Sequence, residues 1–249
     1  MSVLNRLQAV WAEYECMNSN SESHNVDEWD QAIRSVFPQL GPALWWARCA
    51  AMEVPGESRR AVEHQAGREA AVQALENAGV QPVWLASDDT GAPVWPPGVN
   101  GSISHSGNQA VCVVSTHLTL GGMGIDLEHV DHMDQEVARR CLTDVERQAI
   151  ASAVDADLAH LMMLANFCAK EALIKCRGGW GAGLEDPLDF RLHMVDGTGL
   201  NESSVVHWSV SQTGDTPLIP QQPEAVVELR TVIMDGQWCL AGASVMRSL

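Results

Sequence analysis

Two helix-forming runs, each accompanied by short strand-like segments, divide the sequence into halves. The stronger run, 157–177, is rich in Leu, Met and Ala and meets a stop signal at Gly178-Gly179. The weaker run, 59–77, gathers its apolar residues near one face and is followed by a stop signal at Gly79. A chain with one such helix and several strands in each half is expected to form two α+β lobes.

The strand-like segments are apolar runs bounded by Gly, Pro and polar turn residues. They are 82–86, 101–104, 110–116, 122–128, 188–195, 205–210, 225–234 and 237–246. A capping-box pattern, Thr143-x-x-Glu146, predicts a further helix, and the polar stretch 18–30 predicts a loop. The predicted fold is α+β, with its lobes in residues 1–118 and 119–249.

Composition excludes several classes of protein. Hydrophobic residues make up 46% of the 249 positions and charged residues 19%, so a sizeable core can form. Lys plus Arg is 15 against 32 Asp plus Glu, a net charge of −17. Such a surface repels the phosphate backbone, which argues against a nucleic-acid-binding protein. A phosphate ligand would need a local basic cluster or a metal ion.

The cysteines and the apolar runs indicate where the protein works. Seven cysteines, with no C-x-x-C pair, lie mostly inside apolar runs, which is typical of a reducing compartment. The first twenty residues lack the apolar stretch of a signal peptide, and no window approaches the roughly 18 apolar residues of a membrane span. We therefore expect a soluble cytoplasmic protein.

Two carboxylates alternate in the segment Gly124-Ile125-Asp126-Leu127-Glu128. On a strand, Asp126 and Glu128 point to the same face because the side-chain period is two. Carboxylates so placed repel each other unless a cation or protons neutralise them, and carboxylate oxygens suit Mg²⁺. An exposed strand edge with acidic residues facing outward would give the same pattern.

The only two lysines of the chain, Lys170 and Lys175, lie close together on the stronger helix. Glu171 is four residues before Lys175, so these two side chains share a helix face. A surface ion pair would explain this spacing, but an arginine would serve a surface pair equally well. Lysine supplies a compact point charge next to a phosphate or a transferring proton, which favours a functional site.

The segment Pro96–Gly107 is rich in small and hydroxyl residues and includes Ser104-His105-Ser106. Small residues let backbone N–H groups approach an anion, and the hydroxyls and imidazole add donors. A serine hydrolase is excluded because Ser104 and His105 point apart on a strand and no G-x-S-x-G motif is present. A serine-rich turn with a solvated histidine is the alternative.

Arginines supply a second candidate anion site. Arg60 and Arg68 lie eight residues apart on the weaker helix, and therefore within about 80° of each other. Arg139 and Arg140 form another pair, which could be a surface patch. The run His129–Asp134 fits no standard zinc spacing and is interpreted as a polar loop.

Three ordered motifs make the sequence similar to the 4′-phosphopantetheinyl transferases, in the surfactin-type branch and the enterobactin-synthase subtype. They are 103–106 (ISHS), 124–128 (GIDLE) and 167–175 (FCAKEALIK). The segments 63–68 and 93–96 also resemble the enterobactin subtype, and the match runs from about residue 59 to 176. The Gly91-Ala92-Pro93 turn departs from the branch, which often carries a lysine there.

The resemblance implies two similar α+β lobes related by a pseudo-twofold axis, with coenzyme A and Mg²⁺ (or Mn²⁺) bound between them. It implies an enzyme that transfers phosphopantetheine from coenzyme A to a serine of an apo carrier protein. The product would be adenosine 3′,5′-bisphosphate, and the pathway nonribosomal peptide or siderophore synthesis. The alternatives are another Mg²⁺-dependent phosphotransferase or pyrophosphate hydrolase, and an inactive module that binds coenzyme A or a carrier protein. A chain with both lobes is expected to be a monomer.

The resemblance also implies roles for single residues. Asp126, Glu128 and Glu171 would hold the metal on the diphosphate, and Glu171 would also take the serine proton. Lys175 would neutralise the diphosphate, with Lys170 in a similar or orienting role.

For the rest of coenzyme A, the resemblance places Ser104, His105, Arg60 and Arg68 at the phosphates and the nucleotide end. The role of Glu146 stays open between catalysis and helix capping. Because carrier proteins are usually acidic like this chain, we expect docking through apolar contacts and a few arginines such as Arg139 or Arg140.

Overall fold

The computed structural model describes residues 22–52, 54–132, 135–178, 186–196, 205–213 and 226–247. Its helices are α2 (Glu22–Val36), α3 (Arg59–Asn77), α4 (Gln135–Arg140), α5 (Asp144–Ala151) and α6 (Ala156–Gly178). Its strands are β1 (Leu44–Ala50), β2 (Asn100–Ser106), β3 (Gln109–Ser115), β4 (Leu120–His129), β5 (Phe190–Asp196), β6 (Val205–Gln212), β7 (Val226–Met234) and β8 (Trp238–Met246). Short 3₁₀ turns are η1 (Pro38–Ala43), η2 (Val130–His132) and η3 (Pro187–Asp189). The predicted α+β class is confirmed.

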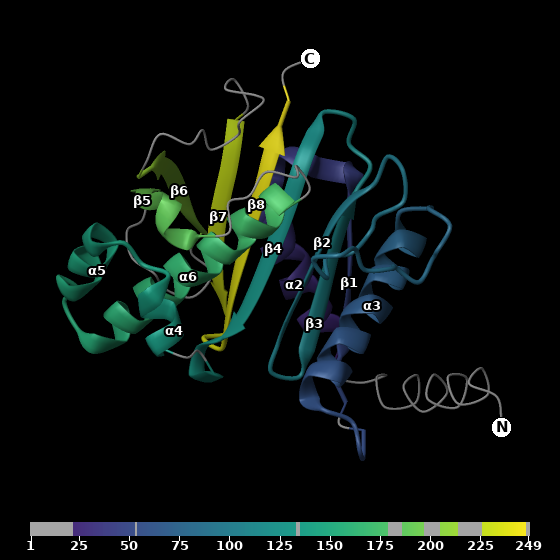
Figure 1. Ribbon diagram of the computed structural model, residues 1–249, viewed down its shortest axis with the longest axis horizontal. Helices are drawn as coiled ribbons and strands as arrows, with labels where there is room; N and C mark the ends of the chain where they lie inside the picture. Colours follow the sequence, from purple (N-terminus) through teal and green to yellow (C-terminus); the bar gives the residue numbers. More distant parts are fainter. Residues whose placement is uncertain are drawn as a thin grey trace.

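The first sheet is antiparallel, with the strand order β1-β3-β2, and α3 packs on it (Figure 1). Helix α3 begins at Ser58, whose hydroxyl accepts a hydrogen bond from the backbone N–H of Ala61. Half of its buried residues are alanine, which allows a close approach to the strands. After the helix, Gly79 adopts a φ of +68°, a conformation in which glycine is favoured.

The second sheet is antiparallel, with the order β4-β8-β7-β6-β5, and α6 lies across one face of it (Figure 1). Gly124 on β4 makes this contact possible. A Cβ at this position would lie 1.9 Å from the carbonyl oxygen of Ala172 on α6. Helix α6 therefore rests directly on the backbone of β4, beside the carboxylates that follow Gly124 in the sequence.

Helix α2 packs against β7 and β8 on the opposite face of the second sheet, and its core cluster extends to β3 of the first sheet. Its buried side chains, among them Trp29 and Ile33, meet Val113 of β3 and Ile125 and Leu240 of the second sheet. This core joins the two sheets, so the helix that precedes the first sheet is covered largely by the second. The last strand of the first sheet ends at Ser115 and the second sheet begins at Leu120, near the predicted lobe boundary. The pseudo-twofold axis relating the two lobes stays a prediction.

Two local expectations were wrong, and one strand was not predicted. The stretch 18–30 was expected to be a loop, but residues 22–30 belong to α2, most of whose few apolar residues pack in the core. No strand forms at 82–86, where the structure has only an isolated bridge between Ser87 and Pro93. Strand β1 was not anticipated. No helix in the described ranges is long and apolar enough to cross a membrane.

Candidate active site

Three serines of β2 connect the two sheets at their facing edges. The hydroxyls of Ser102, Ser104 and Ser106 accept hydrogen bonds from the backbone N–H groups of Ile125, Leu127 and His129 on β4, at 3.0, 3.1 and 3.2 Å. Each serine takes the place that a backbone carbonyl would occupy in a continuous sheet. The seam therefore fixes β2 and β4 in register, although they belong to different sheets.

The same serines orient the two carboxylates of β4. Ser104 donates to Asp126 Oδ1 at 2.9 Å, and Ser106 donates to Glu128 Oε2 at 3.0 Å. Both carboxylates thus meet the seam, as the period of two predicts. Asp126 is buried, and its Oδ2 has no hydrogen-bond partner among the described residues. A buried carboxylate oxygen without a partner is costly unless a ligand reaches it.

Helix α6 brings a lysine to this pair. Lys175 Nζ lies 2.5 Å from Asp126 Oδ1 and donates to Ser104 Oγ at 3.0 Å, with 30% of its side chain exposed. An ammonium has three N–H groups, so a third remains for a ligand. Glu171 lies one helical turn before Lys175 and is partly buried. The structure therefore brings the candidate residues Asp126, Glu171, Lys175 and Ser104 to one place.

Electrostatics set these carboxylates apart from ordinary surface groups. Burial raises the pKa of Glu128 to about 7, and the neighbouring charge of Asp126 contributes to the rise. Burial also raises the pKa of Glu171, as does the charge of Asp126. Burial alone would lower the pKa of Lys175, but the charges of Asp126 and Glu171 outweigh it and raise that pKa above its usual value. The cluster holds more negative charge than Lys175 neutralises, which favours a bound cation.

The described residues contain no group of three Asp, Glu, His or Cys already gathered as metal ligands. Lys175 occupies one oxygen of Asp126, which leaves the unpartnered Oδ2 and the carboxylates of Glu128 and Glu171 as oxygen donors. This donor set is of the kind that hard divalent cations take in proteins. The residues present thus fit an Mg²⁺ or Mn²⁺ ion in chemistry.

His105 follows Ser104 on β2 and faces α3 rather than the carboxylates. Its Nδ1 lies 3.6 Å from Glu63 Oε2, and 39% of the histidine side chain is exposed. Burial lowers the pKa of His105, whereas the charge of Glu63 raises it. Glu63 begins the segment 63–68, which resembles the enterobactin subtype, and no role was predicted for it. Its partner on β2 lies more than forty positions away, so no local pattern could have revealed the pair.

The two candidate arginines of α3 are placed differently. Arg60 is exposed, whereas Arg68 is 3% exposed. Arg68 Nη2 donates to Ser87 Oγ at 2.7 Å, and its buried Nη1 has no partner among the described residues. Burial lowers the pKa of Arg68, and no described carboxylate pairs with it. A buried guanidinium without a carboxylate can receive an anion.

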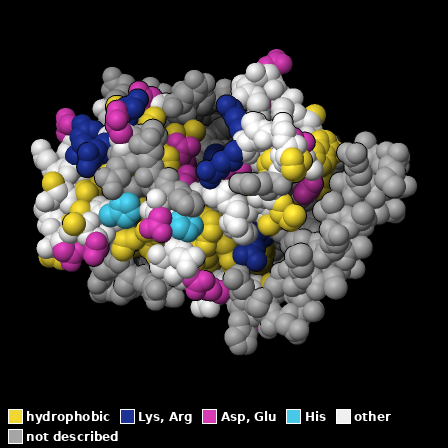
Figure 2. Space-filling model, turned by 90° about the horizontal axis from the view of Figure 1, so that it is seen from below, with side chains coloured by type: hydrophobic (Ala, Val, Ile, Leu, Met, Phe, Trp, Pro, Cys, Tyr) yellow, Lys and Arg dark blue, Asp and Glu magenta, His cyan; other side chains and the backbone are white. Residues whose placement is uncertain are grey.

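A cavity of about 700 Å³ adjoins the cluster. Arg59 and Glu63 of α3 line one side, Asn108 of the β2–β3 turn another, and His129 and Trp238 the end of the second sheet. These elements meet at the lower edge of the molecule in Figure 1, and Figure 2 shows acidic, basic and histidine side chains close together on that face. His129, the residue after Glu128, lines the cavity, so the cavity lies next to the end of the carboxylate cluster.

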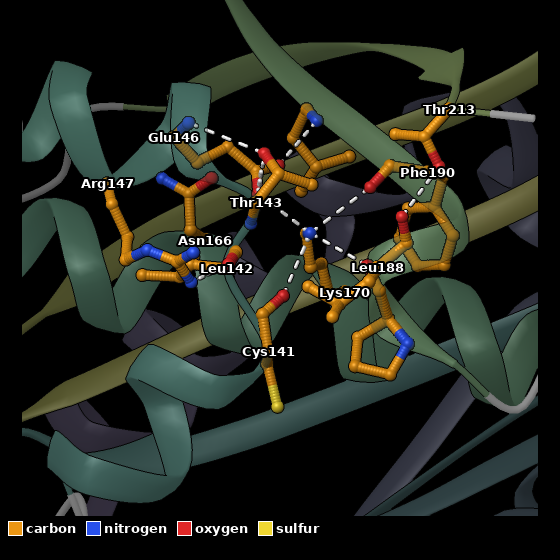
Figure 3. Close-up of polar contacts among 12 residues, drawn as sticks. Cys141, Leu142, Thr143, Glu146, Arg147, Asn166, Lys170, Leu188, Phe190 and Thr213 are labelled. Atoms are coloured by element: carbon orange, nitrogen blue, oxygen red, sulfur yellow. Dashed lines mark hydrogen bonds and ion pairs between the residues drawn. The ribbon is translucent and has the colours of Figure 1, made fainter.

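Lys170, predicted to be a catalytic residue, lies instead in a buried polar network with Glu146 and Cys141 (Figure 3). Its side chain is 0% exposed, and its Nζ donates to Glu146 Oε2 at 2.8 Å. It also donates to three backbone carbonyls, those of Cys141, Pro187 and Phe190, at 2.8 to 3.2 Å. Every N–H of the ammonium is therefore used inside the protein, which leaves none for coenzyme A.

Glu146 completes this buried network. Its Oε2 accepts from the backbone N–H and the hydroxyl of Thr143, so the predicted capping box is confirmed. Its Oε1 accepts from the backbone N–H of Leu192 on β5 at 2.7 Å. Glu146 thus joins the start of α5, the middle of α6 and the edge strand β5. The structure places it in the packing of the second half, away from the carboxylate cluster.

Comparisons with known proteins agree with these motifs. The 4′-phosphopantetheinyl transferase N-terminal domain family matches residues 51–115, and the 4′-phosphopantetheinyl transferase superfamily matches residues 122–217. Enterobactin synthase component D of Escherichia coli (strain K12) is 34% identical over 175 residues, which are 68% of this chain and 81% of that protein. The protein of the same name from Salmonella typhi is 38% identical over 53% of this chain and 54% of its own length.

More distant proteins align as well. The 4′-phosphopantetheinyl transferase Npt of Nocardia iowensis is 26% identical over 73% of this chain and 78% of its own length. The crystal structure of the Thermotoga maritima holo-[acyl-carrier-protein] synthase is 19% identical over 52% of this chain and 65% of that one, with a TM-score of 0.37. The match to the Escherichia coli protein and the two family matches, in order along the sequence, show that the chain belongs to the 4′-phosphopantetheinyl transferase superfamily and is an enzyme of that type.

Proposed function

We propose that this protein transfers the 4′-phosphopantetheine group of coenzyme A to a serine hydroxyl of an apo carrier protein. The observation that carries the proposal is the cluster of Asp126, Glu128, Glu171 and Lys175 at the seam between the sheets. In phosphoryl transfer the protein acts mainly by positioning and by neutralising charge, and this cluster has the groups for both.

Asp126, Glu128 and Glu171 would hold an Mg²⁺ or Mn²⁺ ion together with the diphosphate of coenzyme A. The unpartnered Oδ2 of Asp126 and the raised pKa of Glu128 support this assignment, because both point to a missing positive charge. When bound, the ion would withdraw charge from the phosphate oxygens that it contacts. These carboxylates would fix where the diphosphate lies.

Glu171 would take the proton of the carrier serine. Burial raises the pKa of its carboxylate, which makes Glu171 a stronger base than an ordinary glutamate. The serine oxygen forms a bond to the phosphorus that carries the pantetheine arm, and the bond from that phosphorus to the bridging oxygen of the diphosphate breaks. Adenosine 3′,5′-bisphosphate leaves with the bond's electron pair, and the serine proton stays on Glu171.

Lys175 would neutralise the charge that develops on the leaving diphosphate oxygen. Its pKa lies above the usual value for lysine, so the ammonium stays protonated throughout the working pH range. Ser104 holds the lysine and Asp126 together through one hydroxyl. His105, Arg60 and Arg68 would contact phosphates farther along coenzyme A, with the unpartnered Nη1 of Arg68 as the strongest support.

Lys170 is assigned a positioning role. Its ammonium ties α6 to Glu146 and to the segments before α5 and β5, and the adjacent Glu171 then faces β4.

An acidic carrier protein would dock through apolar contacts and exposed arginines, for which Arg139 and Arg140 at the end of α4 are the candidates. Charge reversal of both should raise KM for the carrier, and an unchanged KM would exclude this docking site.

Intact-protein mass spectrometry tests the function. An apo aryl or peptidyl carrier protein is incubated with this protein, coenzyme A and Mg²⁺, with EDTA in a parallel sample. We expect the carrier to gain one phosphopantetheine, and we expect EDTA to prevent the gain. Cleaved coenzyme A without a modified carrier would instead indicate a hydrolase, and intact coenzyme A across several carrier classes would indicate a binding module. The cytoplasmic location and the monomeric state stay predictions.

A further inference from the structure

Glu63 lies between the guanidinium of Arg59 and the imidazole of His105, beside the carboxylate cluster. Its Oε1 accepts a hydrogen bond from Arg59 Nε at 2.8 Å, and its Oε2 lies 3.6 Å from His105 Nδ1. The glutamate side chain is 14% exposed, whereas Arg59 is 70% exposed. Both α3 residues line the cavity of about 700 Å³. Glu63 is therefore fixed in place at the wall of the cavity.

The contact with Glu63 leaves one ring nitrogen of His105 available. Nδ1 faces the carboxylate, and among the described residues none hydrogen-bonds Nε2. The histidine is partly exposed, so a ligand can reach the ring. A carboxylate on one imidazole nitrogen sets the orientation of the ring and determines which nitrogen is presented to a ligand.

The charges around His105 oppose one another. From α3, Glu63 favours the protonated imidazole and His64 opposes it. From β4 the charge of Asp126 also favours protonation, and from α6 the ammonium of Lys175 opposes it. Burial lowers the pKa of His105, and Glu63 is the largest influence in the opposite direction. Removing the charge of Glu63 would leave the ring neutral at a lower pH than in the wild type.

We propose that Glu63 is a positioning residue, which orients His105 through Nδ1 so that Nε2 is presented to a phosphate of coenzyme A. The inference rests on the proposed function, because it assigns the phosphate to coenzyme A. It also predicts the direction in which Glu63 changes the affinity for coenzyme A. A carboxylate that merely occupied the anion site until coenzyme A displaced it would weaken binding, whereas a positioning carboxylate strengthens binding.

The test compares Glu63→Gln, His105→Gln and the double variant with the wild type. Glu69→Gln is the matched control, because it removes the same charge from the same helix, where Glu69 pairs with Gln65. kcat and KM for coenzyme A are measured from pH 5.5 to 8.5 with a saturating carrier protein. The His105 resonance, identified by its loss in His105→Gln, is titrated by NMR in the same variants.

We expect Glu63→Gln to raise KM for coenzyme A about threefold to tenfold at pH 7 and to change kcat less than about twofold. The pH above which KM rises, and the NMR pKa of His105, should both move down in Glu63→Gln and stay in place in Glu69→Gln. The double variant should have the KM of His105→Gln, because Glu63 acts only through the histidine.

An unchanged or lowered KM in Glu63→Gln, an unmoved His105 pKa, or additive effects in the double variant would overturn the inference. The two kinetic outcomes require an active wild type, so they differ from a failure of the proposed function, in which no variant modifies the carrier. The His105 pKa is measured by NMR and does not depend on transfer. If Glu63→Gln folds poorly, the NMR titration of His105 in Glu63→Asp replaces it. A carboxylate shorter by one methylene should lower the histidine pKa partway, and an unaltered pKa would contradict the inference.

Discussion

Lys175 Nζ on α6 lies 2.5 Å from Asp126 Oδ1 on β4, and both groups bond to the hydroxyl of Ser104 on β2. Three elements from the two halves of the chain thus meet at one carboxylate. The contact uses Oδ1 and leaves Oδ2 buried without a partner among the described residues. The arrangement satisfies part of the charge of the cluster and leaves part for a ligand.

Replacement of this lysine should separate its electrostatic role from a structural one. We expect Lys175→Met to lower the rate of carrier modification by about 10²–10³, the usual loss when one charge-stabilising donor is removed. Single-turnover kinetics with saturating coenzyme A measure this rate. Circular dichroism checks that the variant is folded, because the change leaves the buried Asp126 without its ammonium partner. A rate within a few-fold of the wild type would show that Lys175 does not face the diphosphate.

Glu171→Gln should abolish transfer and leave the fold intact. The amide keeps the shape of the side chain but cannot accept the serine proton or contribute a charge to a metal site. Circular dichroism and intact-protein mass spectrometry of the carrier measure the two properties. Glu76→Gln, an exposed change at the end of α3, is the control. Near-normal transfer by Glu171→Gln would require a different base.

Glu128 predicts a pH dependence of stability in the metal-free protein. Burial and Asp126 raise its pKa from an ordinary value near 4.5 to about 7 in the folded state. A raised carboxyl pKa adds stability below the unfolded value and loses it as the pH rises through the folded value. In EDTA we therefore expect Tm to fall by about 3–8 °C between pH 5 and pH 8.

Two comparisons isolate the contribution of Glu128. The pH dependence of Tm should flatten in Glu128→Gln, because the amide does not titrate. Mg²⁺ with coenzyme A should restore Tm at pH 8 in the wild type but not in this variant. A wild type and Glu128→Gln with the same profile in EDTA would contradict the raised pKa.

The buried pair of Lys170 and Glu146 should control stability. Lys170→Met leaves Glu146 charged and buried, and we expect it to lower the free energy of unfolding by about 3–5 kcal/mol. The double variant with Glu146→Gln should lose less than the sum of the single losses, since the two groups are in contact. Urea unfolding of the four proteins measures the coupling. Strictly additive losses would mean that the ion pair seen in Figure 3 contributes nothing.

Local patterns in the sequence were sufficient for much of the second half. The capping box at Thr143, the long helix 157–177 and the strands around 122–128 all depend on neighbours in the sequence, and the structure has each of them. Helix α2 was not predicted, because its exposed face is so polar that the stretch resembled a loop. Its burial depends on strands far along the chain, which no local pattern shows.

The candidate site was predicted in part for the same reason. Alternation predicted that Asp126 and Glu128 share a face, and helix spacing predicted that Glu171 and Lys175 do. The serine seam that holds β2 against β4 is a contact between two sheets, so it could not be read from either strand alone. The place of Lys170 in a buried polar network likewise depends on Glu146, a distant partner.

The central claim is that Asp126, Glu128 and Glu171 hold a divalent cation on the diphosphate of coenzyme A. Counting Mn²⁺ by the loss of its free-ion EPR signal tests it most directly, with coenzyme A present and a protein-free sample subtracted. We predict one Mn²⁺ per chain in the wild type, little binding in Asp126→Asn and Glu128→Gln, and full binding in Glu76→Gln. Equal Mn²⁺ binding by all four proteins would contradict the account.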